Sequence, residues 1–342
     1  MMQIERRAID IALSHCLPFY AYRLPKTEDV VFGSQEDSGF TSDNGFKIVP
    51  FDIESSHKEK ILYAQLSAAD IINKFPEKGN RYLPEISTRG TGYDEYMRTV
   101  ADCLSQLQKG ALQKVVLSKV KIVGCRLESF GDFFCRLCSE YPDAFIFIFN
   151  SEETGAWIGA SPEILGNYAD SVFSTMALAG TRMAGDSTEW SKKDLDEQGY
   201  VVDYISDILH SAGVNYSISD KYTKKAGKVE HLCNDFTICC PYATAYDLIN
   251  RLHPTPALAG LPVKDALDLI RKVECHGREY YGGYICAFSP RKLHCYVNLR
   301  SMKFNNDKCC LFVGGGIVKA SVPEKEWIET EMKSETLISL LR

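Results

Sequence analysis

The alternation of apolar and polar positions divides the chain into clusters of strands separated by amphipathic helices. Alternating or continuously apolar runs typical of strands cover residues 113–123, 144–150, 156–175, 228–240, 282–302 and 309–319. Helical spacing of apolar residues falls between these clusters, over residues 129–140, 190–211, 242–252, 264–274 and 324–341. Because the strands come in runs and do not alternate strictly with helices, the pattern predicts an α+β fold with mainly antiparallel sheets.

The first 90 residues carry a weaker pattern. It predicts a first helix, short strands, a turn rich in Gly, Ser and Asp over residues 33–45, and a helix over residues 57–74. A helix of about 17 residues that ends at Gly110 is expected next. Its candidate N-caps, in the segment STRGTGYDEY, are Ser87, Thr88 and Thr91.

Three lysines occur in the strand-like segment KVVLSKVKIV. With successive side chains on opposite faces, Lys114 shares a face with Val116 and Ser118, whereas Lys119 and Lys121 share the other face. Lys114 therefore points to the more apolar side. Two interpretations stay open: a strand-end lysine whose amine reaches solvent, or an amine held in a cavity for chemistry.

Size and charge limit the kinds of protein that this chain can be. A chain of 342 residues with 45% hydrophobic content can bury a large core, as one large domain or two ordinary ones. The formal charge of -6 argues against general nucleic-acid binding. The one dense basic segment, KYTKKAGK at residues 221–228, is predicted to be a solvated turn. An anionic substrate would therefore need cations placed locally at its site.

The cysteines suit a reducing cytosol better than a disulfide scaffold, because their number, 13, is odd and they are scattered. The adjacent pairs at 239–240 and 309–310 are expected to point to opposite faces of strands. Cys135 and Cys138 form a C-x-x-C motif, but it lies in a predicted amphipathic helix and has no second pair at zinc-finger spacing. Metal binding is not expected there.

Targeting signals are not convincing. The apolar part of the N-terminal segment is interrupted by Asp10, Ser14 and His15, and no apolar run reaches about 18 residues. The sequence therefore predicts a cytoplasmic protein without a membrane span.

Two predicted helices each carry acids three residues apart. Asp194 and Glu197 form one pair, and Glu326 and Glu329 form the other, with Lys333 four residues further on. The simpler interpretation is two solvated helix faces. If both pairs converge on one Mg²⁺, they form a site for a hard cation with few protein ligands and open positions for water or a substrate carboxylate.

Three further features could carry chemistry. Glu163 follows a Ser-Pro turn inside an apolar run, and a buried, unpaired carboxyl there would have a raised pKa and could donate a proton near neutrality. The segment FVGGGIV lets backbone N–H groups approach an anion closely, although it has no nucleotide-binding spacing. Arg300 lies in a predicted strand, where an arginine usually needs a carboxylate partner.

Taken in order, nine segments resemble the chorismate-utilising enzymes, which include isochorismate synthases, salicylate synthases, anthranilate synthase component I and aminodeoxychorismate synthase. They are KVVLSK, GASPEIL, ALAGTR, KKDLDEQ, LHPTPALAG, GREYYGG, NLR, FVGGGIV and EKEWIETEMK. The resemblance is strongest over residues 91–340. It implies one domain over residues 1–342, with residues 1–90 a shorter N-terminal part of the same fold. In that fold large antiparallel sheets pack face to face inside layers of helices.

The resemblance also implies Mg²⁺ and chorismate, a cyclohexadiene with two carboxylates, and it assigns roles. Lys114 matches the general base that activates water, and Glu163 matches the general acid. Glu197 and Glu329 match the metal glutamates, with Asp194 and Glu326 in the neighbouring acid positions. The matched substrate-binding positions are Gly180, Thr181, His253, Leu258, Tyr281, Arg300, Gly314, Gly315, Gly316 and Lys333.

Two positions discriminate within the family. Aminodeoxychorismate synthases often carry a lysine nucleophile where this chain has Ala179, and amine-transferring members lack the lysine that Lys114 preserves. Water is therefore the expected nucleophile. The expected protein is an isochorismate synthase, an isomerase that feeds menaquinone or siderophore synthesis, with no glutamine amidotransferase subunit, acting as a monomer or weak homodimer. Salicylate synthase is the alternative; an anthranilate-type synthase and a non-catalytic chorismate-binding protein are further ones.

Three departures from the family pattern concern details of the pocket. Ala177 stands where many relatives have proline, Gln198 replaces a common histidine after the first metal glutamate, and Cys286 stands where a glycine often follows the Gly-Gly strand. These departures leave the assigned chemistry in place.

Overall fold

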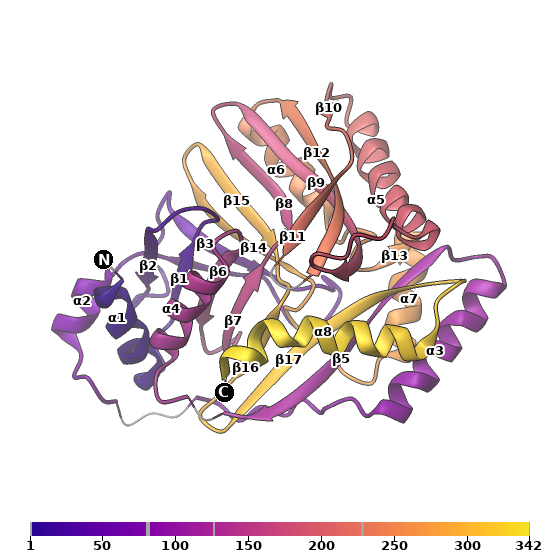
Figure 1. Cartoon of the computed structure of the whole chain (residues 1–342). Helices are drawn as coiled ribbons and strands as arrows, with labels where there is room; N and C mark the ends of the chain where they lie inside the picture. The colour runs from indigo at the N-terminus through magenta and orange to yellow at the C-terminus, as the bar shows by residue number, and fades with distance from the viewer. Residues whose placement is uncertain (1, 80–82, 126, 227–228, 342) are drawn as a thin grey trace.

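Two antiparallel sheets organise the chain (Figure 1). The computed structural model describes residues 2–79, 83–125, 127–226 and 229–341. In spatial order, the strands of the first sheet are β13 (Gly260–Leu261), β5 (Lys114–Gly124), β17 (Lys308–Val318), β16 (Ser301–Phe304), β7 (Ala156–Ser161), β6 (Phe145–Asn150), β1 (Phe19–Arg23) and β2 (Val30–Ser34).

The second sheet faces the first. Its strands, in spatial order, are β10 (Ser217–Ile218), β12 (Val229–Cys239), β9 (Val172–Met183), β8 (Ile164–Ala169), β15 (Lys292–Val297), β14 (Tyr284–Ser289), β3 (Gly45–Val49) and β4 (Lys60–Tyr63). β11 (Tyr222–Ala226) also pairs with β12. All the pairings between these strands are antiparallel, which confirms the predicted α+β class.

Aromatic side chains fill the space between the sheets. In β6 the segment FIFIF sends Phe145, Phe147 and Phe149 to the inner face and the two isoleucines to the outer face, as expected from the strand period of two. Phe145 stacks on Tyr296 of the opposite sheet with ring centroids 4.3 Å apart. This aromatic packing joins the inner faces of the two sheets.

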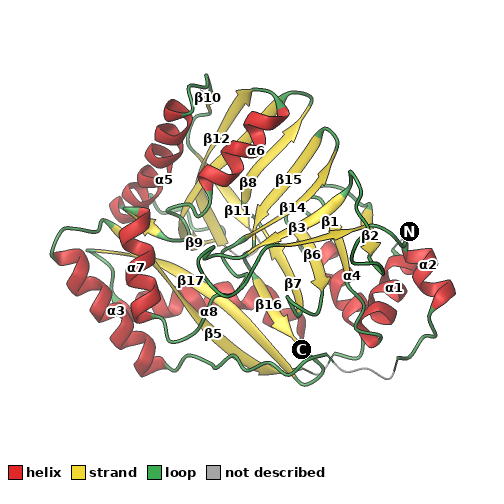
Figure 2. Ribbon diagram, turned by 180° about the vertical axis from the view of Figure 1, so that it is seen from behind, coloured by secondary structure: helices red, strands yellow, loops and turns green. Residues whose placement is uncertain are grey.

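Helices cover the outer faces of both sheets. α1 (Gln3–Ser14), α4 (Phe130–Glu140) and α8 (Pro323–Leu341) pack on the first sheet, and α2 (Ala68–Lys74) packs on α1. α6 (Tyr242–Leu252) lies over β8 of the second sheet (Figure 2). α3 (Tyr93–Gln108), α5 (Lys192–Ser211) and α7 (Val263–Val273) belong to the same hydrophobic cluster as α6. In the part of the chain that is described, no helix has the length and apolar character to cross a membrane.

Most predicted elements are confirmed within a few residues, including the five helices from residue 129 onward and the helix that ends near Gly110. The single runs predicted at 156–175 and 282–302 are each broken by tight turns. Asp170 (φ 50°) and Ser171 (φ 66°) form the turn between β8 and β9. Asp and Ser are common turn residues, but without a Gly beside them they gave only a weak turn signal inside a long strand-like run.

Three predictions about local structure were wrong. Residues 60–63 of the predicted helix 57–74 form strand β4, and the helix is limited to α2. The N-cap of α3 is Gly92; Thr91 instead exchanges hydrogen bonds with Val120 of β5. The basic segment predicted as a solvated turn contains β11, and its residues 227 and 228 lie outside the described residues.

The N-terminal strands extend both sheets, because β1 pairs with β6 and β3 pairs with β14. That residues 1–342 form one domain stays a prediction. Cys286 and Cys295 are joined as a disulfide between β14 and β15, against the expectation of reduced thiols for this pair. Cys239 is exposed and Cys240 buried, as alternation along β12 predicted.

Candidate active site

A cavity that is partly open to solvent lies where β5 and β17 of the first sheet meet β9 and β12 of the second. Twelve of the predicted site residues line it, although they come from segments far apart in the sequence. They are Lys114, Glu163, Gly180, Thr181, Glu197, Leu258, Tyr281, Arg300, Gly314, Gly315, Gly316 and Lys333.

Lys114 is fully buried at the start of β5 and points into the cavity beside Val116. Val115 and Leu117, on the other face of the strand, belong to a hydrophobic core cluster, so the prediction that Lys114 faces the more apolar side is not confirmed, although its amine does lie in a cavity. Its Nζ lies 2.9 Å from Oε1 of Glu197, within ion-pair distance but outside hydrogen-bond geometry. The amine is thus held in an enclosed space by one carboxylate, and its other hydrogens are available to a molecule in the cavity.

Glu163 lies between β7 and β8 and is buried. Burial raises the pKa of the Glu163 carboxyl to about 7, and the charges of Lys114 and Lys224 oppose part of that rise. A carboxyl with this pKa carries a proton for much of the time near neutrality and can act as a general acid. The raised pKa predicted from its apolar surroundings agrees with this placement.

Arg300 is held by neutral partners. It lies in the turn between β15 and β16, not inside a strand, and its φ is 48°. Its Nη1 donates to Oγ1 of Thr336 (3.1 Å), and its Nη2 donates to Nε2 of His231 (3.3 Å). The expectation of a carboxylate partner was wrong for this guanidinium within the described residues. Arg300 consequently retains its full charge for an anion in the cavity.

His231 was missed by the sequence analysis. Burial, followed by the positive charge of Arg300, lowers the pKa of His231 to about 3, so the ring is neutral. Its Nδ1 lies 2.7 Å from the carbonyl oxygen of Gly180, an arrangement that requires the proton on Nδ1 and leaves Nε2 as the acceptor for Arg300. A lone histidine in a strand gave no signal, because its partners are far away in the sequence: Gly180 in β9 and Arg300 in the turn before β16.

The three glycines of FVGGGIV lie inside β17, not after it, and pair with β5. A Cβ at Gly316 would lie 2.4 Å from Oε1 of Glu197 and 2.9 Å from Cε of Lys114. Any side chain there would collide with both groups. Gly316 therefore provides the space in which the amine and the carboxylate meet.

Three carboxylates from α5 and α8 lie close to the same glycine segment. A Cβ at Gly315 would be 3.7 Å from Oε2 of Glu326 and 3.7 Å from Oε1 of Glu329. Glu326 pairs with Lys193 (2.6 Å), and Glu329 pairs with Lys333 (2.7 Å). Burial alone would raise the pKa of Glu329, but nearby groups, Lys333 first and then Lys193, together outweigh burial and hold that pKa below its usual value.

The carboxylates beside the glycines offer oxygen ligands to a divalent cation. In the described ranges, no group of three or more His, Cys, Asp and Glu side chains is arranged to hold a metal ion. Glu326 Oε2 is nevertheless buried without a hydrogen-bond partner, and burial raises the pKa of Glu326 despite its pairing with Lys193. An orphaned oxygen beside two further carboxylates fits a hard cation such as Mg²⁺. Binding would require these carboxylates to exchange their lysine partners for the ion.

Four predicted site residues are not among those that line the cavity: Glu326 and Glu329, which lie beside Gly315, and Asp194 and His253. Asp194 forms hydrogen bonds with Ser191 at the N-cap of α5, so its carboxylate serves the helix terminus. His253 is half-buried, with its Nε2 3.1 Å from the carbonyl oxygen of Pro50 and its ring against Tyr284. Gln198, which replaces a common histidine, is buried and donates from Nε2 to Asn234 (2.7 Å).

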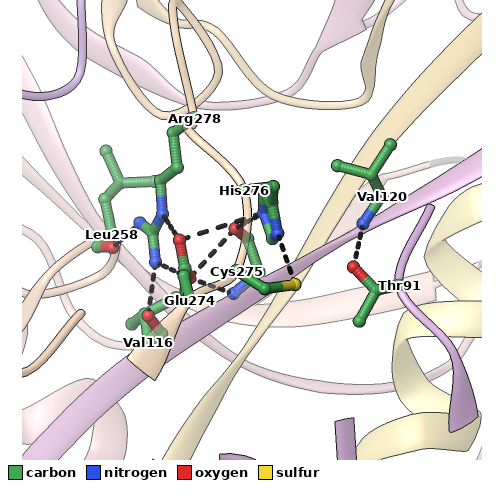
Figure 3. Close-up of polar contacts among 9 residues, drawn as sticks. Thr91, Val116, Val120, Leu258, Glu274, Cys275, His276 and Arg278 are labelled. Carbon is green, nitrogen blue, oxygen red and sulfur yellow. Dashed lines mark hydrogen bonds and ion pairs between the residues drawn. The ribbon is translucent and has the colours of Figure 1, made fainter. Parts of the chain in front are cut away.

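A buried polar cluster supports the wall of the cavity (Figure 3). Arg278 donates to the carbonyl oxygens of Val116 (2.6 Å) and Leu258 (2.9 Å), both of which belong to residues that line the cavity. Its charge is balanced by Glu274, whose carboxylate also accepts from the backbone N–H of Ser118 (2.6 Å). One ion pair therefore joins the strand of Lys114 to the loop of Leu258.

Replacing Arg278 with leucine is expected to destabilise the protein by ~3–5 kcal/mol, because the Glu274 carboxylate would stay buried without its counter-ion. The loss of stability is measured as a lower urea concentration at the midpoint of unfolding. The double variant Glu274→Leu, Arg278→Leu should recover part of it. Arg251→Ala, which breaks an exposed pair with Asp247, is the control and should change stability by less than ~1 kcal/mol. A single Arg278 variant as stable as this control would contradict the supporting role.

Known proteins were compared with the sequence and with the structure. The family described as chorismate binding enzymes matches residues 49–342. The isochorismate synthase MenF of Pasteurella multocida is 30% identical over 264 residues, which cover 72% of this chain and 61% of that protein. The chain thus spans about three fifths of the length of this curated relative.

Solved structures share the fold. The menaquinone-specific isochorismate synthase MenF from Escherichia coli superposes with a TM-score of 0.81 at 20% identity, covering 98% of this chain and 91% of that one. Anthranilate synthase component I from Streptococcus pneumoniae superposes with a TM-score of 0.68 at 18% identity, covering 95% and 92%. The sandwich architecture implied by the resemblance is confirmed. With a family match over most of its residues, the chain belongs to the chorismate binding enzymes.

Proposed function

We propose that this protein is an isochorismate synthase that converts chorismate to isochorismate with Mg²⁺. In the reaction, the oxygen of a water molecule bonds to ring C2 as the C4 hydroxyl leaves and the ring double bonds shift. The proton taken from the attacking water is balanced by a proton given to the departing hydroxyl, so one water enters and one leaves. The net change is an isomerisation.

The observation that carries this proposal is one cavity lined by both a buried lysine amine and a carboxyl whose pKa is about 7. Lys114 is assigned as the base that deprotonates water, and Glu163 as the acid that protonates the leaving hydroxyl. Ala179 lines the same cavity, so no amine nucleophile stands at the position where some relatives of this family carry lysine. Water is consequently the proposed nucleophile.

The cationic and the acidic residues of the site would bind different parts of the substrate. Arg300 would bind one substrate carboxylate, since its present partners are neutral. Glu197, Glu326 and Glu329 would hold Mg²⁺, which would neutralise the other carboxylate and fix the ring. The base role requires a neutral amine, so Glu197 must take a partner other than Lys114 in the reacting state. Together these side chains would bind the substrate and hold its ring in position for the reaction.

The proposal is tested by incubating the purified full chain with chorismate and Mg²⁺ and separating the products by chromatography. Isochorismate as the product supports it. Salicylate, detected by its fluorescence, would identify a salicylate synthase instead. A product that forms only with ammonia would identify an amine-transferring enzyme. Unchanged chorismate in the presence of Mg²⁺ would refute the proposed activity.

Turnover is expected to fall as the pH rises through about 7. The pKa of Glu163 is raised to about 7, so its proton is present below that pH and is lost above it, and the general acid is then absent. The measurement is kcat against pH. In Glu163→Gln this alkaline limb should disappear, with kcat lower by about 10²- to 10⁴-fold on the acid side of the transition and by less above it. If kcat of that variant still falls as the pH rises through about 7, the fall is caused by another titrating group.

Other sequence-based expectations stay predictions. They concern the cytoplasmic location, the monomeric or weakly dimeric state, the independence from an amidotransferase, and the choice between menaquinone and siderophore synthesis. The similarity to isochorismate synthases, including the menaquinone-specific MenF from Escherichia coli, supports the activity proposed here.

A further inference from the structure

A second hollow adjoins the cavity and shares two of its lining residues, Pro162 and Arg300. We call it the vestibule; its other described lining residues are Glu140, Tyr141, Pro142, Asp143, Ala144, Ala160, Lys224, Lys225 and Thr336. Because Arg300 borders both spaces, an anion that enters through the vestibule meets the guanidinium assigned to substrate binding.

Lys224 lines the vestibule, and its strand pairs with a strand that borders the cavity. It belongs to β11, and the register of β11 on β12 places it directly opposite His231, which lines the cavity. Cross-strand partners project from the same face of a sheet, so the Lys224 side chain lies on the cavity side. The segment predicted as a solvated turn is therefore a strand that brings a lysine to the site.

The Lys224 ammonium has a poor internal partner. Its Nζ lies 3.3 Å from the sulfur of Met176, which is a weak acceptor, and the residue is half-buried. In the described parts of the chain, no carboxylate lies within ion-pair distance of its Nζ. Lys114, Lys193 and Lys333, by contrast, each form an ion pair with a glutamate. A half-buried ammonium without a counter-ion attracts an anion from solvent.

The charge of Lys224 also reaches the catalytic groups, because it opposes the rise in the pKa of Glu163. Glu140 and Asp143 border the vestibule as well, but both are exposed, and solvent and salt screen exposed charges most strongly. Positive potential is therefore concentrated at the inner end of the vestibule, between Lys224 and Arg300.

We propose that Lys224 forms an anion-capture subsite in the vestibule, which receives a carboxylate of the dianionic substrate and passes it to Arg300. This inference rests on the proposed function, because it takes a cyclic dicarboxylate as the ligand. The subsite acts on substrate entry, so it should affect kcat/KM more than kcat.

The test compares Lys224→Met with the unaltered protein, using chorismate and Mg²⁺ at a pH on the acid side of the Glu163 transition. At low ionic strength, kcat/KM should fall about tenfold with kcat nearly unchanged, and the difference should shrink as salt is added. Lys224→Arg should restore most of kcat/KM. Lys221→Met is the control: Lys221 is an exposed lysine just before β11 that is not among the described lining residues of either space.

Two results would overturn the subsite. One is a kcat/KM for Lys224→Met equal to that of the Lys221 control at every ionic strength. The other is a fall in kcat that salt does not change and Lys224→Arg does not repair, which would indicate a structural role. Product identity with the unaltered protein decides the proposed function separately, so failure of the two proposals can be told apart.

Discussion

Lys114→Ala is expected to abolish water addition, with kcat lower by about 10²- to 10⁴-fold, the usual contribution of a positioned general base. Lys114 is the fully buried lysine in the cavity, and its neighbour Glu197 would remain in place without it. Chorismate binding in the presence of Mg²⁺ should persist, because Arg300 and the carboxylates on α8 are untouched. Calorimetric titration measures this binding, and chromatography measures product.

Lys121→Ala is the matched control for this variant. Lys121 is a half-buried lysine of the same strand, on the opposite face, and pairs with Glu331 at 2.6 Å. Its loss should change kcat little. Full turnover by Lys114→Ala would refute the assignment of Lys114 as the base, whereas loss of both turnover and chorismate binding would indicate that the cavity had collapsed.

Glu329→Ala is expected to lose activity together with its dependence on Mg²⁺. Glu329 lies near Glu326 across Gly315, and its removal would take two oxygens from the acidic cluster that fits a hard cation. Calorimetric titration of Mg²⁺ into the protein without substrate should show affinity weaker by at least about tenfold. This measurement does not depend on turnover.

Glu324→Ala, an exposed acid in the first turn of the same helix, is the control and should bind Mg²⁺ like the unaltered protein. Activity of Glu329→Ala that is still stimulated by Mg²⁺ would exclude Glu329 as an essential ligand. Glu326→Ala offers a second check, because Oε2 of Glu326 is the buried oxygen that lacks a hydrogen-bond partner.

Local patterning predicted the faces of strands and helices well. The alternation in KVVLSKVKIV placed Lys114 and Lys119 on opposite faces, and the structure has Lys114 in the cavity and Lys119 against Trp327 and Glu331. This works because the period of a strand or helix is set by the backbone and is written in neighbouring residues. The elements that local patterning predicted wrongly, such as β4 and β11, are short strands that depend on pairing with a neighbouring strand.

The ordered motifs identified the family and most of the cavity residues, but they did not identify the partners of those residues. Lys193 and Glu326 pair across 133 positions of the chain, and His231 meets Arg300 across 69. The role of His231 as a neutral support was invisible, since it depends on a carbonyl group at Gly180 and on burial by both sheets.

The sequence by itself determined the class of fold, the faces of its strands, and which lysine and which acid line the cavity. Only the tertiary structure decided how charge is arranged: lysines beside the acidic cluster, neutral partners around Arg300, and an unpaired ammonium at the vestibule. The reason is that periodicity is a local property of the backbone. Electrostatic pairing depends instead on distances between side chains that only the packing of the two sheets brings together.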